Sequence, residues 1–393
     1  MIPMKNINFI FGSENIVQTP LPVFDEEVCS FITEVSTKLM SSSLIRQFPD
    51  LSALAFWGRK KNLERMKNNF GDLSGWLGRG LCFHIAPSNI PINFAFTYLF
   101  GLLAGNANIV RLPSKEFPQV ESLCSIFKDV LKNYPKIAQR TAFVKYPRDE
   151  EITAEFCKIA DIRMIWGGDE TISSVKKLPT KSRCIDISFA DRYSLALING
   201  NVVLSSSEEE IKKLANNFYN DTFLMDQNAC SSPQIILWEN DSSMARKIFW
   251  DAVFNLAKQK YHLQDASAVD KYTLMCEEAI NNQNFVSCHR QENLIYREEL
   301  AKLDECIVNH RGKCGYFYEY TLSDFGELLN IINEKFQTIT YFGIDALSLR
   351  DRLISANSLG VDRIVPIGKA MDIDIIWDGF DLVRVISRRI MIS

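Results

Sequence analysis

The sequence predicts an α/β protein made of two doubly wound α/β domains. Two observations lead to this prediction. Short apolar runs alternate with helical stretches from about residue 80 to residue 368, and the pattern changes near residue 200. A length of 393 residues also fits two domains better than one. We expect residues 1–199 to hold an N-terminal region and the first domain, completed by residues 370–393, and residues 200–369 to form the second.

The first domain is predicted from apolar runs separated by stretches with helical spacing. Strands at this spacing imply right-handed crossovers and a parallel sheet, which binds ligands at the carboxyl ends of its strands. The expected strands are Leu81–Ala86, Ala107–Leu112, Ala142–Tyr146, Ile162–Trp166, Arg183–Ile187 and Ser194–Ile198. The expected helices are Ile90–Ala104, an amphipathic helix over 120–131, and segments near 149–158 and 169–177.

The second domain is expected to open with a helix, because Ser207 and Glu210 have the spacing of a capping box. A polar run from Met225 to Ser232 follows that helix and leads into an apolar strand, Pro233–Trp238. Later elements are a strand at Gln337–Phe342, a helix at Asp345–Asn357 and, in the tail, a short strand at Leu382–Ile386.

The composition excludes several classes of protein. The chain is 47% hydrophobic and 23% charged, which rules out intrinsic disorder and small disulfide scaffolds. A net charge of −4 gives no reason to bind nucleic acid or an anionic membrane. Its most apolar stretch, Pro91–Gly105, contains Asn93 and is too short to span a bilayer. With no secretory signal and scattered cysteines, we expect a cytoplasmic protein whose thiols are mostly inert and buried.

Cys230 is the strongest candidate for a reactive side chain. It lies in a polar connection beside Asn228, Ser231 and Ser232, just before an apolar strand. Amide donors in such a loop stabilise a thiolate, the form in which cysteine acts as a nucleophile. The alternative is a passive small residue at the start of a strand, and position alone does not decide between them.

Two turns after predicted strands are candidates for binding a substrate oxygen or a nucleotide. Asn89 follows the first strand in a proline-bounded turn, where its amide donates to a developing oxyanion or simply stabilises the turn. Arg111, Ser114 and Lys115 form a basic turn that suits a cofactor phosphate or ribose, or only a solvated strand end.

A third turn, Gly167-Gly168, joins a strand to a helix and allows a nucleotide to approach the backbone closely. The sequence contains neither GxGxxG nor GxxxxGK[ST]. These absences argue against an ordinary Rossmann dehydrogenase and a P-loop NTPase.

The histidines and the remaining cysteines do not predict a metal site. Cys288-His289 precede Cys306, His310 and Cys314, but no CxxC pair is present, and we expect no metal. His84 lies in an apolar strand, where a hydrogen-bonded core histidine is a better reading than a catalytic base.

Several segments, taken together in their order along the chain, resemble the aldehyde dehydrogenase superfamily. More specifically, they resemble its acyl-CoA reductase branch, typified by the fatty-acid reductase subunit of bacterial bioluminescence. The segments span roughly residues 75–390: PSNIP (87–91), LAGNANIVRLPSK (103–115), WGG (166–168), DQNAC (226–230), and a late region from Gln337-Thr338 through 363–368 to Trp377-Asp378-Gly379. The resemblance implies an aldehyde-dehydrogenase-like fold in which the first domain binds NAD(P), the second is catalytic, and a small arm serves oligomerisation.

The resemblance also implies roles for individual residues. Cys230 is the nucleophile, and Asn89 forms the oxyanion hole with the backbone N–H of Cys230. Lys115 stands where NAD-preferring relatives often carry a Glu, so NADPH is favoured, with NADH as the alternative. The implied cofactor-binding residues are Pro87, Ser88, Arg111, Ser114, Lys115, Gly167 and Gly168.

One departure from the superfamily favours reduction over oxidation. Hydrolytic members carry a Glu-Leu-Gly-Gly-Lys motif whose Glu activates the deacylating water, and the matching stretch here, 187–194, lacks that Glu. Asp191 is the nearest substitute, a few residues out of register. A reductase of acyl thioesters needs no such water. It would release an aldehyde from an acyl-Cys230 intermediate.

Two other hypotheses for the function stay open: a hydrolytic aldehyde dehydrogenase, and a non-redox partner protein that only accepts and transfers an acyl group. The resemblance further implies an acyl-CoA or acylated protein as substrate, an acyl-protein synthetase as a partner, and a homo-oligomer.

Overall fold

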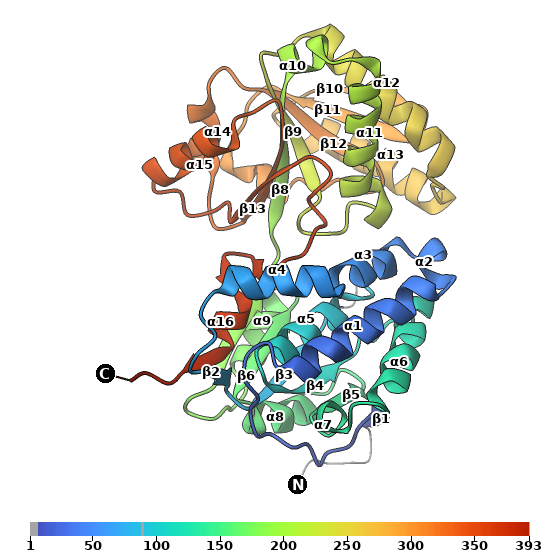
Figure 1. The fold of residues 1–393 in the computed structure, drawn as a ribbon. Coiled ribbons are helices and arrows are strands. Elements are labelled where there is room, and N and C mark those ends of the chain that lie inside the picture. Colours follow the sequence, from blue (N-terminus) through green and yellow to red (C-terminus); the bar gives the residue numbers. More distant parts are fainter. Residues whose placement is uncertain (1–6, 88–89, 393) are drawn as a thin grey trace. The chain divides into compact units, whose positions relative to one another are not determined.

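The computed structural model describes residues 7–87 and 90–392 of the chain (Figure 1). It consists of two compact units, Met1–Asp191 with Ile373–Ser393, and Arg192–Asp372. Strand β8 (Tyr193–Asn199), which we placed in the first domain, pairs with strands of the second unit on both of its sides. The division expected after residue 199 therefore lies after residue 191.

The first unit is built on a six-stranded sheet in the order β1-β5-β4-β3-β6-β7. All neighbours are parallel except β1 and β5. The chain moves outward from β3 in one direction through β4 and β5, then returns to the other side for β6 and β7, which is the doubly wound arrangement we predicted. The strands are β1 (Asn8–Phe11), β3 (Leu81–Ile85), β4 (Ala107–Arg111), β5 (Thr141–Lys145), β6 (Ile162–Trp166) and β7 (Ile185–Phe189).

Helices cover both faces of this sheet. The N-terminal helices pack with α5 and α6 against one face, and α8 and α9 pack against the other. The helices are α1 (Glu26–Ser41), α2 (Leu44–Gln47), α3 (Pro49–Trp57), α4 (Lys60–Phe70), α5 (Asn93–Leu103), α6 (Pro118–Leu131), α7 (Pro135–Ala138), α8 (Glu150–Ile159) and α9 (Asp169–Lys176). The predicted strand Arg183–Ile187 begins two residues too early, because Arg183 and Cys184 lie before β7.

The tail of the chain completes the first unit, and one prediction there is wrong. Residues Leu382–Val385 form helix α16 rather than a strand. Leu382, Val383 and Ile386 are buried because their spacing puts them on one helical face. The strand is the following segment, β17 (Ser387–Arg389), which pairs with β2 (Trp76–Gly78), and a small hairpin of β15 (Ile376–Trp377) and β16 (Phe380–Asp381) precedes the helix.

The second unit contains a seven-stranded sheet in the order β10-β11-β12-β9-β8-β13-β14, parallel except for β10. Its other strands are β9 (Pro233–Glu239), β10 (Phe285–Gln291), β11 (Ile295–Leu300), β12 (Tyr316–Thr321), β13 (Phe336–Phe342) and β14 (Arg363–Pro366). Its helices are α10 (Gly200–Ser205), α11 (Glu208–Thr222), α12 (Ser243–Lys260), α13 (Asp265–Asn281), α14 (Phe325–Ile331) and α15 (Ala346–Ser355), with short 3₁₀ turns η2 (Phe223–Met225) and η3 (Glu305–Asn309).

Each face of the second sheet has its own core. Helices α11 and α12 bury their apolar sides against one face, and α14 and α15 bury theirs against the other. The capping box predicted for α11 is present, since Ser207 and Glu210 bond each other's backbone N–H groups.

The thiols are less buried than we expected. Only Cys82, Cys124 and Cys157 are buried, and Cys306 is exposed. Over the residues that the structure covers, no helix combines the length and the apolar character that crossing a membrane would require.

Candidate functional site

Cys230 lies in the connection between α11 and β9, three residues before the strand begins. Its side chain is half-buried, whereas Ser231 and Ser232 are buried. The loop meets the second sheet at the amino ends of β8, β9 and β13. Open parallel sheets usually bind ligands at the carboxyl ends of their strands, so that tendency does not predict the position of Cys230.

Gln227 fixes the shape of the loop. Asp226 and Gln227 both have left-handed backbone angles, with φ of 51° and 57°, which costs roughly 1–2 kcal/mol per residue for an L-amino acid. Several hydrogen bonds offset this cost. The buried Gln227 side chain accepts from the N–H of Gly315 at 2.7 Å and donates to the carbonyl of Tyr316 at 3.0 Å, while Gln234 donates to the Gln227 carbonyl at 3.1 Å.

Ser194 holds the backbone of Cys230 directly. Its hydroxyl donates to the Cys230 carbonyl at 2.6 Å and accepts from the N–H of Thr338 at 3.2 Å. The side chain is fully buried at the start of β8. A single hydroxyl thus ties the cysteine to two neighbouring strands of the sheet.

Reasoning from the sequence did not find Ser194 or Asp221, which is a second anchor of this loop. Asp221 is buried in the last turn of α11, and its carbonyl accepts the Ser232 hydroxyl at 2.7 Å. An aspartate near a helix end is ordinary locally, so no local signal pointed to it.

Three of the other predicted residues lie at the carboxyl ends of adjacent strands in the first sheet. Pro87 follows β3, Arg111 ends β4 and Gly167 follows β6. These strands are neighbours in the order β4-β3-β6, and β3 is where the winding reverses. Doubly wound sheets bind nucleotides at this position. Ser88 and Asn89, predicted to bind cofactor and the oxyanion, lie outside the described residues.

The Gly167-Gly168 turn leaves the start of α9 open. Gly168 caps the helix with ordinary extended angles, and a Cβ added there would meet no atom within 4 Å. The backbone therefore does not require glycine at this position. The missing side chain leaves room for a group to approach the first N–H donors of the helix, which bind phosphate oxygens well.

The basic turn after β4 is partly engaged within the protein. The Arg111 guanidinium lies 4.4 Å from the centre of the Tyr146 ring and donates to the Pro147 carbonyl at 3.4 Å. Lys115 is exposed, with its Nζ 5.2 Å from the Phe117 ring centre, and Ser114 beside it is exposed too. The switch point, the open helix start and this cationic turn together fit a nicotinamide dinucleotide.

The prediction for His84 is confirmed. The ring is fully buried, with Nδ1 2.8 Å from Thr97 Oγ1 and Nε2 2.9 Å from Asn108 Oδ1. Burial lowers its pKa to about 4, so the ring is neutral and is a structural group.

The histidine and cysteine segments considered for metal binding lie in different elements, with Cys288 and His289 in β10. His310 bonds the Glu278 carboxylate, and Cys306 lies in the 3₁₀ turn η3. Among the described residues, no three His, Cys, Asp or Glu side chains are grouped to hold a metal ion.

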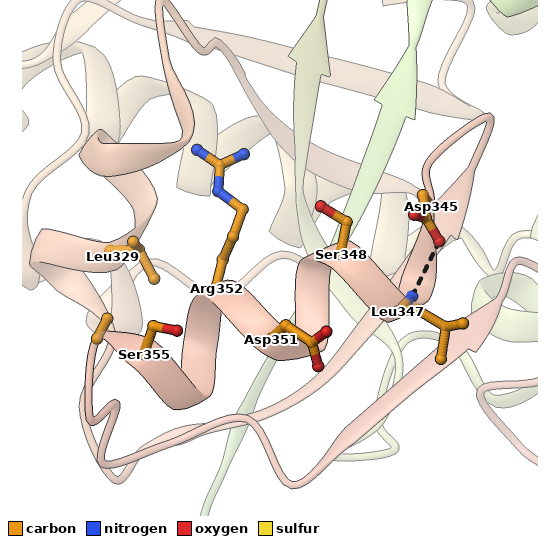
Figure 2. A pocket seen from close by; sticks show the side chains of 8 residues that line it. Leu329, Asp345, Leu347, Ser348, Asp351, Arg352 and Ser355 are labelled. Carbon is orange, nitrogen blue, oxygen red and sulfur yellow. Dashed lines mark hydrogen bonds between the residues drawn. The ribbon is translucent and has the colours of Figure 1, made fainter.

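A separate pocket lies on the surface beside α15 (Figure 2). Its volume of about 710 Å³ is within the range of ligand sites. All lining residues except Leu329 are exposed, however, and none belongs to the groups described above. We do not assign it to the candidate site.

Comparison with known proteins gives related sequences and a related fold. A family model described as Acyl-CoA reductase (LuxC) matches residues 38–388. The long-chain acyl-protein thioester reductase of Aliivibrio fischeri is 26% identical over 325 residues, covering 75% of this chain and 62% of that protein. The Vibrio harveyi protein of the same description is 24% identical over 285 residues, covering 63% and 57%.

Among solved structures, the NAD-dependent benzaldehyde dehydrogenase from Corynebacterium glutamicum superimposes with a TM-score of 0.60 at 11% identity, covering 94% of this chain and 84% of that one. At this identity the likeness establishes the aldehyde dehydrogenase fold. The present chain matches less than two thirds of the length of the two thioester reductases.

Proposed function

Because the chain belongs to the acyl-CoA reductase (LuxC) family, we propose that it reduces an acyl thioester to an aldehyde, with Cys230 as the covalent nucleophile. The observation that carries the proposal is the loop geometry. Cys230 is half-buried, and its main-chain carbonyl accepts a hydrogen bond from the Ser194 hydroxyl. The turn before it is held by hydrogen bonds of the Gln227 side chain. Such fixed placement is what covalent catalysis requires of a nucleophile.

In the first half-reaction the Cys230 thiolate attacks the thioester carbonyl. A new C–S bond forms to Cys230, the original C–S bond breaks, and the departing thiolate takes up a proton. The acyl group on sulfur stays electrophilic enough to accept hydride, whereas an ester on serine would accept it poorly. Amide donors at Asn89 and at the backbone of Cys230 are proposed to hold the oxyanion, on the basis of family resemblance.

In the second half-reaction the acyl carbon is reduced. A nicotinamide cofactor, when bound, supplies the hydride. Cys230 then carries a thiohemiacetal, whose C–S bond breaks to release the aldehyde and restore the thiolate. The lack of the hydrolytic Glu in 187–194 favours this outcome over release of an acid.

We propose that Pro87, Arg111, Ser114, Lys115, Gly167 and Gly168 hold the cofactor, together with Ser88. The positive charge of Lys115, in the turn after β4, supports NADPH over NADH, because it can pair with a 2′-phosphate. The substrate is an acyl-CoA or an acylated protein delivered by a synthetase partner. We further propose a cytoplasmic homo-oligomer.

The test is consumption of NADPH or NADH by the purified protein with acyl-CoA substrates, comparing wild type with Cys230→Ala. The matched control is Cys306→Ala, which removes an exposed thiol of the same unit. We expect thioester-dependent NADPH consumption, at least about a thousandfold slower in Cys230→Ala and unchanged in the control. Intact mass should show an acyl adduct that Cys230→Ala lacks.

Other outcomes identify the competing functions. Oxidation of added aldehyde to acid with NADP⁺ would favour a hydrolytic dehydrogenase. An acyl adduct without any cofactor consumption would favour an acyl-transfer partner. Full activity in Cys230→Ala would remove the cysteine from the mechanism.

A further inference from the structure

Asp221 connects the loop of Cys230 with the 368–370 turn, which is distant from it in the sequence. It lies in the last turn of α11, which leads into the loop of Cys230. Its carboxylate accepts the N–H of Gly368 at 2.6 Å and the N–H of Ala370 at 3.0 Å. Its main-chain carbonyl accepts the hydroxyl of Ser232, two residues after the cysteine. One residue therefore fixes both the 368–370 turn and the far side of the nucleophile loop.

The turn and the loop also touch each other. The Ser231 hydroxyl lies 3.8 Å from the sulfur of Met371. Arg363 braces the turn from β14, donating to the carbonyls of Ala370 at 2.7 Å and Lys369 at 2.8 Å. A shift of the turn would be transmitted to the residues beside Cys230.

The turn has little freedom to adopt another shape. Gly368 has a φ of +100°, and a Cβ at that position would meet the Asn217 side chain at 2.6–3.0 Å. The carboxylate of Asp221 is the acceptor for the N–H of Gly368. Only 1% of Asp221 is exposed, so its carboxylate lies inside the second unit rather than in solvent.

We propose that Asp221 is a positioning residue for Cys230. The ionised carboxylate of Asp221 clamps the 368–370 turn and thereby holds the nucleophile loop in its reactive shape. The inference rests on the proposed role of Cys230. Asp221 does not touch the reacting atoms in this proposal. It acts through the backbone of Ser232 and through the turn.

The charge state of Asp221 is set by its surroundings. Burial raises the pKa of Asp221 to about 7, and the two backbone N–H donors oppose that rise. The charged groups that face it are Asp372, which raises the pKa further, and Arg363, which lowers it. Asp372 is itself paired with Lys369 at 2.7 Å. A protonated carboxyl accepts fewer N–H bonds than a carboxylate, so the clamp should weaken as the pH falls through about 7.

The experiment compares wild type with Asp221→Asn, using the rate at which an acyl-CoA acylates Cys230, followed by intact mass. An amide keeps the shape but presents an NH₂ group to one of the two N–H donors. At about pH 8.5 we expect acylation about tenfold slower in the variant, and at about pH 5.5 nearly equal rates. The thiolate fraction cancels in this ratio, so the ratio reports the clamp.

The matched control is Glu319→Gln, which alters another fully buried carboxylate of the same unit, bonded to the indoles of Trp238 and Trp250 at 2.9 and 2.7 Å. This control should lower thermal stability without a pH-dependent change in the acylation ratio. Equal rates for wild type and Asp221→Asn at high pH would overturn the proposal, as would a ratio that does not vary with pH.

A second variant and a second reagent keep the test decisive. Ser232→Ala removes only the hydroxyl that reaches the Asp221 carbonyl, and we expect acylation a few-fold slower at every pH. If Asp221→Asn does not fold, a wild-type rate in Ser232→Ala would overturn the proposal. Alkylation of Cys230 by iodoacetamide, measured by peptide mass, should show the same pH-dependent ratio. Because alkylation needs no thioester chemistry, it tests the clamp even if acyl-CoA fails to acylate the wild type, which would contradict the proposed function alone.

Discussion

At the scale of single residues, burial decides which ionisable groups can carry charge. The orientation of Asn108 is fixed by its own amide, which donates to the Asn106 carbonyl at 2.8 Å. Its oxygen therefore faces His84 Nε2, which must carry the proton, and Nδ1 accepts from Thr97. Both nitrogens have partners in the neutral ring, so protonation would bury a charge without adding a hydrogen-bond partner.

His84 should make the stability of the first unit depend on pH. The unfolded chain takes up a proton at the ordinary value of 6.5, whereas the pKa in the fold is lowered to about 4. Stability is therefore complete above pH 6.5 and falls as the pH drops toward 4, by about 3 kcal/mol. Urea unfolding across this range should show a steeper loss in wild type than in His84→Gln.

The control for this prediction is His262→Gln, which changes an exposed histidine and should keep the wild-type pH dependence. Parallel curves for wild type and His84→Gln would contradict the assignment of a neutral buried ring.

The sequence indicated Cys230 because its local setting is unusual, and the resemblance gave it a role. Ser194 and Asp221 could not be found in this way. Their partners Thr338 and Gly368 lie 144 and 147 residues away. Serine at a strand entrance and aspartate near a helix end are ordinary locally, and only the packed sheet brings their partners within hydrogen-bond distance.

At the scale of elements, the best predictions are those with a strong local cause. Helix α11 begins where a capping box predicts it, and strand β6 has the expected bounds because five buried residues follow one another. The prediction of a strand at 382–386 is wrong because a short apolar run is compatible with either a strand or a helix. Packing decided for the helix, which places Leu382, Val383 and Ile386 in the core.

Removing the cap of α11 should destabilise the second unit. In Ser207→Ala the N–H of Glu210 loses its acceptor, Ser207 Oγ, which lies 3.3 Å away. The Glu210 carboxylate loses the Ser207 hydroxyl as a donor. We expect a loss of about 1 kcal/mol in the free energy of unfolding. Ser205→Ala, which removes an exposed hydroxyl in the preceding helix, should change it by less than about half that amount. Equal effects of the two substitutions in urea titrations would argue against the cap.

At the scale of the whole molecule, the chain leaves its first unit after Asp191 and returns to it at Ile373. The returning tail is part of the core, since Trp377, Leu382 and Val383 are buried in it. The side chain of Asn106 donates to the Ile386 carbonyl at 2.9 Å, across 280 residues of sequence. The first unit is therefore complete only when both ends of the chain are present.

A chain ending at Asp372 should lose the structure of its first unit. Each large apolar side chain of the tail contributes roughly 2 kcal/mol, and their sum is comparable to the stability of a typical domain, about 5–15 kcal/mol. Limited proteolysis followed by mass spectrometry should show cleavage throughout residues 7–191 and protection of residues 192–372. The control chain ends at Ile390 and so lacks the exposed Met391 and Ile392. Protection of the first unit in both chains would contradict this prediction.

The sequence by itself determined the α/β class, most strands and helices, the prominence of Cys230 and the resemblance to thioester reductases. All of these follow from side chains within a few residues of one another, where periodicity, capping and loop composition act. The tertiary structure decided that β8 belongs to the second sheet, that the tail closes the first unit, and that Ser194 and Asp221 anchor the Cys230 loop. Those features depend on hydrogen bonds and burial between segments far apart in the chain, which no local pattern encodes.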